Sequence, residues 1–485
     1  MDYIFLIFLL FYIVSSLLLL PYPINLVYLA FKSRNYKDLP PKSFFKEVDL
    51  PTVALQIPVY NEPNVIHSTL KNILDIDYPR DKLFVTILDD STDATSYLID
   101  EFLGTETSDF QITVKRRKNR TGYKAGALHQ ATLDTQAEFI AIFDADCKIP
   151  SNFLRNTVHY FTDESIGAIQ TRWNHTNMKF SLFTLAMSIG LDGHFNVEKL
   201  GRMKTNGFIA FNGTGGIWRR SAILEAGNWS SKTLAEDLDI AFRYQFIGKN
   251  VHYLYDVTVQ QEIAPTLKLW GIQQTRWSRG FAQNLRLHMS KVLTGVHRKN
   301  RFQGAIQLTA YLVPFFLLIN IVSSASLLFF KDFSSYSDFL VIFNIGLTGV
   351  SISGLLVYSV AIKRAHRPLW HILLIPLFLF WGLSLIIRIF IGVLQGFVRF
   401  GGEFKRTPKF DLDNNHQVQT KTKIKMPLDA TVFIELIFLL FIGLAVFKTL
   451  EIGPVMILGT IFYIYVFLSL FLMFASSITH YLASK

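Results

Sequence analysis

The stretch Phe139-Ile140-Ala141-Ile142-Phe143-Asp144-Ala145-Asp146 decides the fold of the larger part of this chain. Five apolar residues run without interruption and end in two acids that flank one alanine. A short, wholly apolar run of this kind is typical of a strand that is covered on both faces in a parallel sheet. Ligands of such sheets bind beyond the carboxyl ends of the strands, where Asp144 and Asp146 would lie.

Four further strands are expected around this run, each followed by a turn or a helix: Val53–Val59, Phe84–Asp89, Ile112–Lys115 and Ile166–Thr171. Residues 32–264 therefore predict an α/β domain with a mostly parallel sheet. Polar residues follow two of these strands as well, with Tyr60-Asn61-Glu62 after the first and Asp89-Asp90 after the second. We expect them at the same edge of the sheet as the two acids.

Four charge-free apolar runs lie outside this domain, at residues 3–31, 302–330, 339–362 and 452–479. Each reaches or exceeds the roughly 20 residues that a helix needs to cross a bilayer, so each predicts a membrane span. The first is expected as an uncleaved anchor, because Asp2 stands where a signal peptide carries basic residues.

Basic residues beside the apolar runs predict that the α/β domain lies in the cytoplasm. Lys32, Arg34 and Lys37 follow the first run, and residues 298–301 carry three more before the second. The formal net charge is +11, and much of the excess lies near these runs. We therefore expect a multi-pass membrane protein whose anionic partner is the lipid bilayer, not nucleic acid. The single cysteine, Cys147, fits a reducing compartment.

The C-terminal membrane region, residues 302–485, contains one ambiguous segment. Residues 369–398 include Arg388 and precede a basic stretch, so we expect interfacial or re-entrant helices there and a cytoplasmic loop at 399–428. True spans are expected near Ala430–Phe447 and Ile452–His480. This arrangement gives about five spans, and about six if residues 369–398 cross completely.

Two acid-bearing loops are candidates for chemistry, and each has a simpler alternative. Asp144 and Asp146 offer oxygen ligands for Mg²⁺ or Mn²⁺, although paired acids at a strand end also occur without a metal. A carboxylate of Asp89 or Asp90 can accept a hydrogen bond from a base or ribose. The same stretch, with Ser91-Thr92-Asp93, is also an ordinary helix N-cap.

Two expected helix starts supply further candidates. Lys124 stands where it can meet a phosphate at the positive end of a helix, with a solvated lysine as the alternative. Glu236 and Asp237 are adjacent, and their repulsion raises the proton affinity of one of them, which suits a general base. The alternative is that these acids only complement the helix dipole.

Residues 265–301 predict amphipathic interfacial helices that carry the last motif. Gln273, Arg276 and Trp277 stand at i, i+3 and i+4, so they share one helix face. Arg276 can bind a departing diphosphate, and Trp277 offers a flat apolar face to a sugar ring. Alternatively, the Trp and Arg side chains lie among lipid headgroups.

The order Asp90, Asp144-x-Asp146, Asp237 and Gln273-x-x-Arg276-Trp277 resembles the D, DxD, D, QxxRW signature of glycosyltransferase family 2, the family of cellulose, chitin and hyaluronan synthases. Residues 56–62, 88–93, 122–128 and 211–216 resemble its cellulose-synthase-like glucomannan mannosyltransferases and their xyloglucan-glucan relatives. The resemblance covers about residues 50 to 290. It implies a GT-A-like, nucleotide-sugar-binding α/β domain inserted between transmembrane α-helices.

The resemblance also implies roles for individual residues. Nucleotide-sugar binding would fall to Pro58, Tyr60, Glu62, Asp89, Asp90, Lys124, Asp144 and Arg276, and metal binding to Asp146 with Asp144. Acceptor binding would fall to Phe211, Asn212, Gly213, Thr214, Gln273 and Trp277. Asp237, with Glu236 beside it, would deprotonate the acceptor hydroxyl, and in-line attack would invert the anomeric configuration. Ala235 replaces the family's usual threonine. The basic loop at residues 400–410 lacks the sequence motif that is usual in the gating loop of processive relatives, which leaves processivity open.

The expected function is transfer of a hexose to a growing β-linked polysaccharide, with translocation of the product as an open possibility. UDP-glucose is the first expectation for the donor and GDP-mannose the second. Two alternatives remain open from the sequence: transfer of a single sugar to a lipid, and a non-catalytic membrane scaffold or transporter. The sequence does not fix the oligomeric state.

Overall fold

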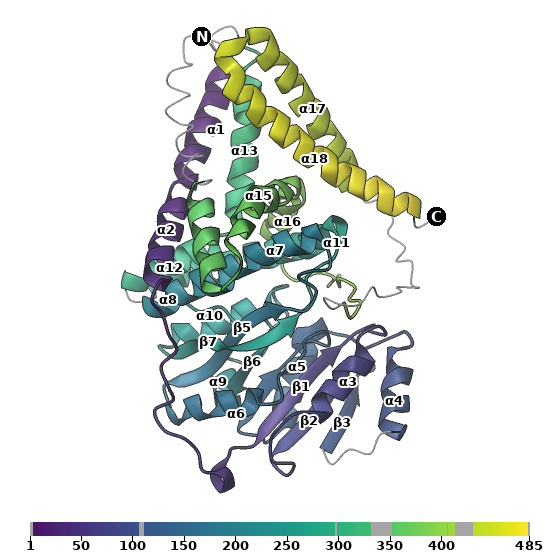
Figure 1. Cartoon of the computed structure of the whole chain (residues 1–485). Coiled ribbons are helices and arrows are strands. Elements are labelled where there is room, and N and C mark those ends of the chain that lie inside the picture. Colours follow the sequence, from purple (N-terminus) through teal and green to yellow (C-terminus); the bar gives the residue numbers. More distant parts are fainter. Residues whose placement is uncertain are drawn as a thin grey trace.

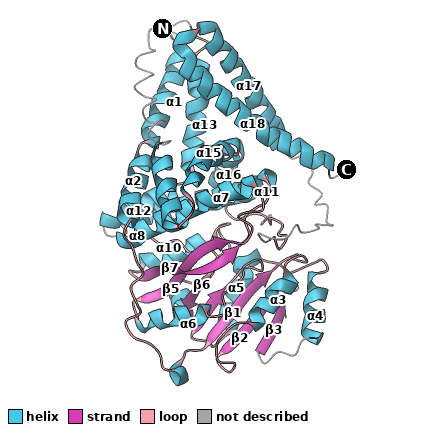
Figure 2. Ribbon diagram, viewed as in Figure 1, coloured by secondary structure: helices cyan, strands magenta, loops and turns pink. Residues whose placement is uncertain are grey.

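The computed structural model of this chain describes residues 3–105, 111–295, 298–330, 352–404, 406–412 and 430–483. An α/β domain forms the lower part of Figure 1, and long helices rise from one side of it. Figure 2 shows that the strands gather in that lower part. Helices α1 (Tyr3–Leu19) and α2 (Pro21–Ser33) precede the domain, and further apolar helices follow it, so the domain is inserted between them.

In the described part of the chain, seven strands form one mixed sheet in the order β3-β2-β1-β4-β6-β5-β7. Their bounds are β1 Val53–Val59, β2 Leu83–Asp89, β3 Gln111–Arg116, β4 Phe139–Ile142, β5 Ile166–His175, β6 Gly216–Arg219 and β7 Asn250–Gln261. Strands β1 to β4 are parallel, whereas β6 runs antiparallel to both β4 and β5. The prediction of a mostly parallel sheet is confirmed, and β6 and β7 add two strands that were not predicted.

The sheet separates two hydrophobic cores, because successive side chains of a strand point to opposite faces. From β4, Phe139 and Ala141 enter one core, which is covered by α3 (Ile66–Leu74), α4 (Thr95–Thr105) and α6 (Phe153–Val158). Ile140 and Ile142 enter the other, which is covered by α5 (Tyr123–Asp134), α9 (Arg220–Glu225) and α10 (Glu236–Phe246). Coverage on both faces explains the unbroken apolar run before Asp144.

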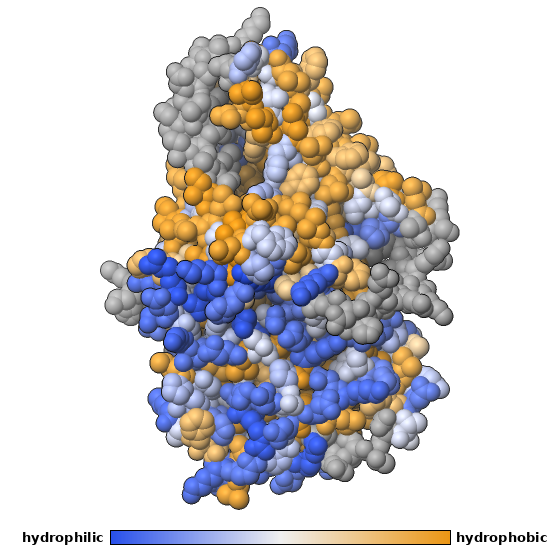
Figure 3. All heavy atoms as spheres, viewed as in Figure 1, coloured by the Kyte–Doolittle hydropathy of each residue, from blue (hydrophilic) through white to orange (hydrophobic). Residues whose placement is uncertain are grey.

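Three described helices are long and apolar enough to cross a membrane. They are Tyr3–Ser33, which joins α1 and α2, Thr431–Ile452 (α17) and Ile457–Leu482 within α18 (Ile457–Ala483). Figure 3 shows the corresponding change in surface character, from hydrophilic over the lower domain to hydrophobic over the helices. The prediction of an α/β domain between membrane helices is therefore confirmed as a fold.

Two helix pairs are bent and can each form one broken span or a re-entrant loop. The first is α12 (Arg298–Leu308) with α13 (Leu312–Leu327), and the angle between the segments Asn300–Leu308 and Leu312–Leu327 is 64°. Pro314 explains this break, because its ring clashes with the carbonyl four residues earlier and it lacks an N–H. The run at 302–330, expected as one span, is therefore interrupted.

The second pair comprises Leu369–Ser384, which contains α15 (Ile375–Ser384), and α16 (Ile386–Val398), with a bend of 49°. Such a bend agrees with the expected interfacial or re-entrant pair at 369–398, and with a broken span. Much of the expected span at 339–362 and of the expected loop at 399–428 lies outside the described residues.

Helix α11 (Leu267–Thr294) joins the α/β domain to the membrane helices, because it packs against α10 on the domain side and against α16. The approach to α16 requires glycine. A Cβ atom on Gly392 would lie 2.1 Å from Ser278 Oγ, and one on Gly396 would lie 2.5 Å from the Arg279 carbonyl oxygen. Arg388 of α16 in turn forms a buried ion pair, 2.7 Å long, with Glu435 of α17.

We predict that Glu435→Ala lowers the free energy of unfolding by about 3 to 5 kcal/mol, because it leaves the buried Arg388 charge without this carboxylate. Thermal unfolding of the detergent-solubilised chain measures the effect. The matched control is Lys448→Ala, which breaks the more exposed Lys448–Glu451 pair on the same helix and should cost less than about 1 kcal/mol. Equal effects of the two variants would contradict the prediction.

Candidate active site

Three neighbouring parallel strands deliver polar residues to one edge of the sheet. Val59 of β1 is in register with Asp89 of β2, and the Phe143 amide after β4 donates to the Gln56 carbonyl of β1. The residues that follow these strands therefore leave the sheet side by side. This geometry places Tyr60, Asp90 and Asp144 along the same edge, where parallel sheets bind ligands.

Lys124 connects the loop after β4 with the glycine-rich loop before β6. Its Nζ atom donates to Asp144 Oδ1 at 2.5 Å and to the Gly213 carbonyl at 2.9 Å. Gly213 has φ +76°, and a Cβ atom there would lie 3.0 Å from Asp237 Oδ2. Burial opposes the charge of Lys124, but the carboxylates of Asp144 and Glu236 outweigh burial and raise its pKa. Lys124 thus lies among three acids.

Glu236 and Asp237 begin α10, where Glu236 is buried and Asp237 is half-buried. Burial, and then the charge of Asp237, raise the pKa of Glu236 to about 7. Burial also raises the pKa of Asp237, whose Oδ1 accepts a hydrogen bond of 2.8 Å from the Leu238 amide. Two adjacent carboxyls in this setting titrate as a pair, and one of them holds its proton to unusually high pH.

Arg276 of α11 brings a second cation to these acids. Burial lowers the pKa of its guanidinium, whereas the charges of Glu236, Asp144 and Asp237 favour its charged form. Its Nε atom is buried and has no hydrogen-bond partner among the described residues. We call Lys124, Asp144, Glu236, Asp237 and Arg276 the acid–cation cluster. The cluster keeps a free donor for an anionic ligand.

Two arginines surround the residues predicted to meet the nucleotide base. Arg117 donates to both carboxylate oxygens of Asp90, with 2.9 Å from its Nε to Oδ1. The Arg120 Cζ atom lies 3.2 Å from the centre of the Tyr60 ring, and its Nε lies 4.0 Å from Asp90. The sequence analysis did not single out these arginines, although they are near in sequence to Lys124.

Asp89 has a different environment from its neighbour. It is buried and accepts hydrogen bonds from Arg116 Nε at 2.8 Å, Ser96 Oγ at 2.6 Å and the Ser91 amide at 3.0 Å. These partners make Asp89 a support of the loop after β2. The predicted contact between Asp89 and the nucleotide remains a prediction.

A basic segment, which we define as residues 401–412 without the undescribed Lys405, lies over the loop after β4. Lys409 Nζ lies 2.6 Å from Asp146 Oδ2 and donates to the Glu262 carbonyl at 3.0 Å. Burial opposes its charge, but Asp146 and Glu262 raise the pKa of Lys409. A cationic group of the chain itself therefore occupies one side of the predicted metal ligand.

The basic segment is fixed at two further points. Arg406 forms an ion pair with Glu62, whose pKa burial raises to about 8. The amides of Phe410 and Leu412 donate to the Glu262 carboxylate at 3.2 Å and 3.1 Å. Burial raises the pKa of Glu262 to about 6. The sequence indicated a basic loop here, but it gave no sign of these acidic partners.

Asp144 and Asp146 suit a metal only together with a ligand. Among the described residues, no three His, Cys, Asp or Glu side chains converge as a metal site. Mg²⁺ is commonly held by one or two carboxylates together with substrate phosphates, which needs no third acid. The contact of Asp146 with the Lys409 ammonium shows that its environment favours a cation. These residues therefore fit a metal shared with a diphosphate.

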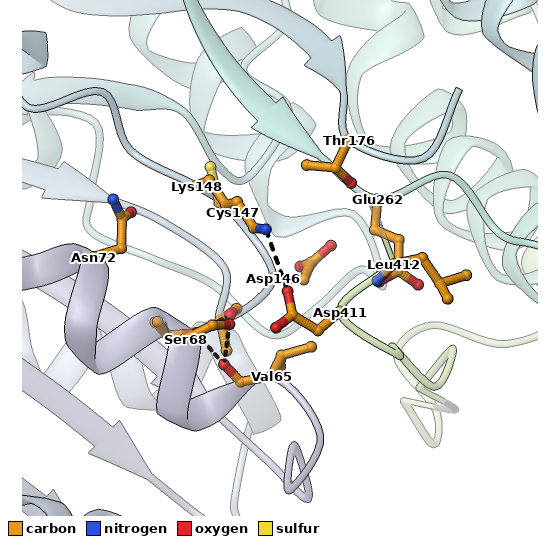
Figure 4. A pocket seen from close by; sticks show the side chains of 12 residues that line it. Val65, Ser68, Asn72, Asp146, Cys147, Lys148, Thr176, Glu262, Asp411 and Leu412 are labelled. Atoms are coloured by element: carbon orange, nitrogen blue, oxygen red, sulfur yellow. Dashed lines mark hydrogen bonds and ion pairs between the residues drawn. The ribbon is translucent and has the colours of Figure 1, made fainter. Parts of the chain in front are cut away.

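A small pocket that is open to solvent adjoins Asp146 on the side of α3. Figure 4 shows Asn72 and Ser68 of α3 on one side of it, and Glu262, Asp411 and Leu412 on the other. The ion pair drawn there joins Lys148 and Asp411 over 3.5 Å. The basic segment thus forms part of the pocket wall.

The loop predicted to line the acceptor site is anchored to the acid–cation cluster. Thr214 Oγ1 accepts a hydrogen bond of 2.9 Å from the Asp144 amide, and the Asn212 amide donates to Gln170. The ring of Phe211 is buried between Trp218 and Trp229. Its ring therefore supports the loop from within the core, and the predicted acceptor contact of Phe211 remains a prediction.

Three predicted residues have less defined surroundings. Gln273 and Trp277 are half-buried on α11 beside Arg276, and Pro58 is half-buried near the end of β1. Their predicted roles toward acceptor and donor remain predictions.

Comparison with known proteins gives this geometry a family. Residues 51–280 match the model described as glycosyltransferase like family 2. These residues form a family 2 glycosyltransferase domain. Glucomannan 4-beta-mannosyltransferase 1 of Oryza sativa subsp. japonica is 38% identical over 252 residues, which are 50% of this chain and 48% of that protein. The family 2 resemblance is thereby confirmed.

Other relatives agree with this domain assignment. Probable glucomannan 4-beta-mannosyltransferase 6 of the same rice is 32% identical over 335 residues, 67% of this chain and 53% of that protein. This chain thus spans about half the length of the curated relatives it matches. The solved structure of mannosyltransferase PcManGT from Pyrobaculum calidifontis, in complex with GDP-Man and Mn²⁺, shares the fold, with a TM-score of 0.52 and 20% identity over 74% of this chain and 99% of that one.

We predict that Glu236→Gln leaves the acidic limb of the pH profile of kcat/KM in place, because Glu236 keeps its proton while Asp237 ionises. Glutamine has the shape of that protonated carboxyl and is likewise neutral. Activity falls as pH falls through the apparent pKa of Asp237, because the base must be unprotonated. Release of nucleoside diphosphate over about pH 5 to 9 measures the position of the limb. Exposed Glu225→Gln is the control, and a limb moved by roughly one unit in Glu236→Gln would contradict the assignment.

We predict that Lys409→Met lowers the apparent Kd for Mn²⁺ of the donor-free protein by about tenfold, because it removes a competing cation from Asp146. Electron paramagnetic resonance of free Mn²⁺ measures the affinity. Lys148→Met is the matched control, since Lys148 pairs with Asp411 on the outer side of the pocket. Unchanged affinity in Lys409→Met would show that the ammonium does not compete with the metal.

Proposed function

We propose that this chain is a membrane-embedded, inverting hexosyltransferase that extends a β-linked polysaccharide from a nucleotide sugar, with GDP-mannose as the preferred donor. The observation that carries the proposal is the acid–cation cluster. Three carboxyls and two cations, of which Glu236 is buried and the others half-buried, meet at the ligand-binding edge of the sheet, and one cation keeps an unused donor. This combination suits a diphosphate leaving group beside a general base.

Each member of the cluster has a step in the proposed reaction. Lys124 and Arg276 bind the diphosphate and stabilise the negative charge that develops as it leaves. Asp237 accepts the proton of the acceptor hydroxyl while that oxygen attacks the anomeric carbon in line, so an α-linked donor gives a β-linked product. Asp144 and Asp146 would hold Mg²⁺ or Mn²⁺, which neutralises diphosphate charge when bound.

Two arguments favour GDP-mannose over UDP-glucose, which was the first expectation. The relatives are named as glucomannan mannosyltransferases, and the solved structure with the same fold is a complex with GDP-Man. Chemistry agrees, because a carboxylate has two acceptor oxygens and the guanine edge offers two adjacent donors, whereas uracil offers one. Asp90 would bind that edge, with Tyr60 and Arg120 beside the ring.

The acceptor is proposed from the position of the site. Arg276 and Trp277 lie on α11, which packs against α16 of the second bent pair and against α18, the last membrane helix. A growing polysaccharide that passes Trp277 would therefore reach the membrane helices, and its translocation is part of the proposal. Transfer of one sugar to a lipid and a non-catalytic scaffold are the competing outcomes of the test.

We predict that the purified chain, in detergent with Mn²⁺, releases diphosphate fastest from GDP-mannose in a panel that includes UDP-glucose. Asp237→Asn should lower transfer by about 10²- to 10⁴-fold, because it removes the proton acceptor. Asp146→Ala should abolish metal-dependent turnover, and exposed Asp75→Asn should leave it unchanged.

The product distinguishes the acceptors. Radiolabel in a polymer that a β-mannanase digests supports the proposal, whereas an organic-soluble product identifies a glycolipid synthase. Absence of turnover with every donor, in the wild type as in Asp237→Asn, would refute an enzymatic function.

A further inference from the structure

The stretch directly before the catalytic acids, Lys232–Ala235, is held by side chains of α11. We call this stretch the acid loop. Gln283 Oε1 accepts a hydrogen bond of 2.8 Å from the Leu234 amide. Asn284 Nδ2 donates to Thr233 Oγ1 at 3.2 Å and to the Ala235 carbonyl at 3.1 Å. Helix α11 therefore sets the position from which Glu236 and Asp237 start.

The same Gln283 side chain also holds the start of the basic segment. Its Nε2 atom donates to the carbonyls of Arg399 and Gly401, both at 2.8 Å. Gly401 is fixed on its other side as well, because its amide donates to the Lys232 carbonyl at 2.8 Å. The chain thus turns from α16 into the basic segment while in contact with the acid loop.

This turn has a backbone that depends on glycine. Gly401 and Gly402 have φ values of +59° and +123°. A Cβ atom on Gly402 would lie 2.3 Å from the Arg279 guanidinium, which itself donates to the Gly401 carbonyl at 2.9 Å. The turn is therefore closely packed on α11, within two helical turns of Arg276.

Gln283 uses both of its side-chain donors in these contacts. Its side chain is fully buried, at 0% exposure. An amide side chain has two N–H groups and a carbonyl oxygen. Here the N–H groups donate to the carbonyls of Arg399, at the end of α16, and of Gly401, in the basic segment, while the oxygen accepts from the acid loop. Either neighbour can shift only if this side chain also shifts or loses a buried hydrogen bond.

Both neighbours lead directly to the site. The acid loop continues into Asp237, and the basic segment continues to Phe404, whose ring centre lies 4.1 Å from the Arg276 Cζ atom. Further along, Lys409 lies on Asp146. One buried amide therefore bridges the part of the site that carries the general base and the part that covers the diphosphate.

We propose that Gln283 is a positioning residue that couples the placement of the catalytic acid to the placement of the basic segment over the donor. The proposal rests on the function proposed above. Under this proposal, Gln283 makes catalysis depend on whether the basic segment has closed over the donor. Gln283 lies outside the Gln273-x-x-Arg276-Trp277 motif. The energy of placing Phe404 over the donor then depends on the position of Asp237, and the reverse also holds, because Gln283 contacts both segments.

A triple-mutant cycle tests this coupling. Thr233→Val loosens the acid loop, Phe404→Leu loosens the basic segment, and neither touches Gln283. We expect their effects on kcat/KM for GDP-mannose to be non-additive by about fivefold or more in the wild type, and additive within about twofold in Gln283→Met. The matched background is Gln303→Met. It removes another buried side-chain amide, which lies on α12 and donates to Asn25 of α2, and it should keep the non-additivity.

Non-additivity that persists in Gln283→Met, or additivity in the wild type, overturns the coupling. A second readout does not depend on turnover. In donor-free protein, Phe404→Leu should speed hydrogen exchange of the acid-loop amides in the wild type and in Gln303→Met, but not in Gln283→Met. If no donor is turned over, the proposed function fails while this exchange experiment still decides the coupling. Equal exchange changes in all three backgrounds would refute it.

Discussion

Charge balance at the edge of the sheet is the constraint on which the rest of this structure depends. Asp144, Glu236 and Asp237 are brought together with only partial access to water, which is costly unless cations meet them. Lys124 and Arg276 supply those cations from α5 and α11. A different feature places each of three members of this cluster. The unbroken β4 strand places Asp144, the glycine before α5 places Lys124, and the packing of α11 on α10 places Arg276. With one carboxyl inclined to keep its proton, the cluster is close to neutral before a diphosphate arrives.

Helix α11 links that cluster to the bilayer. Over a few turns it presents Arg276 to the acids, Gly280 to the acid loop and Gln283 to the basic segment, while glycines of α16 allow close contact on its other side. A Cβ atom on Gly280 would lie 2.8 Å from the Ala235 side chain. A displacement of α16 would therefore be transmitted to Asp237, the proposed general base. This continuity gives a physical reason for placing the family 2 domain directly against the membrane helices.

The sequence predicted the elements whose signal is local. The β4 run, the acids after it and the α11 motif each carry a pattern within a few residues. Strand β6 has only four residues, too few to show a period. Strand β7 does alternate apolar with mostly polar residues from Val251 to Val259, and the sequence analysis did not use this signal. The pairing of Lys409 with Asp146, the arginines on Asp90 and Tyr60, and the burial of Phe211 depend on contacts between distant segments. Composition alone could not locate those contacts.

An electron cryo-microscopy structure of the chain with GDP and Mn²⁺ tests the central claim most directly. The account predicts that the diphosphate lies between Lys124 and Arg276, that the metal lies against Asp144 and Asp146, and that Lys409 has left Asp146. A diphosphate bound away from both cations, with the contact between Lys409 and Asp146 intact, would contradict it.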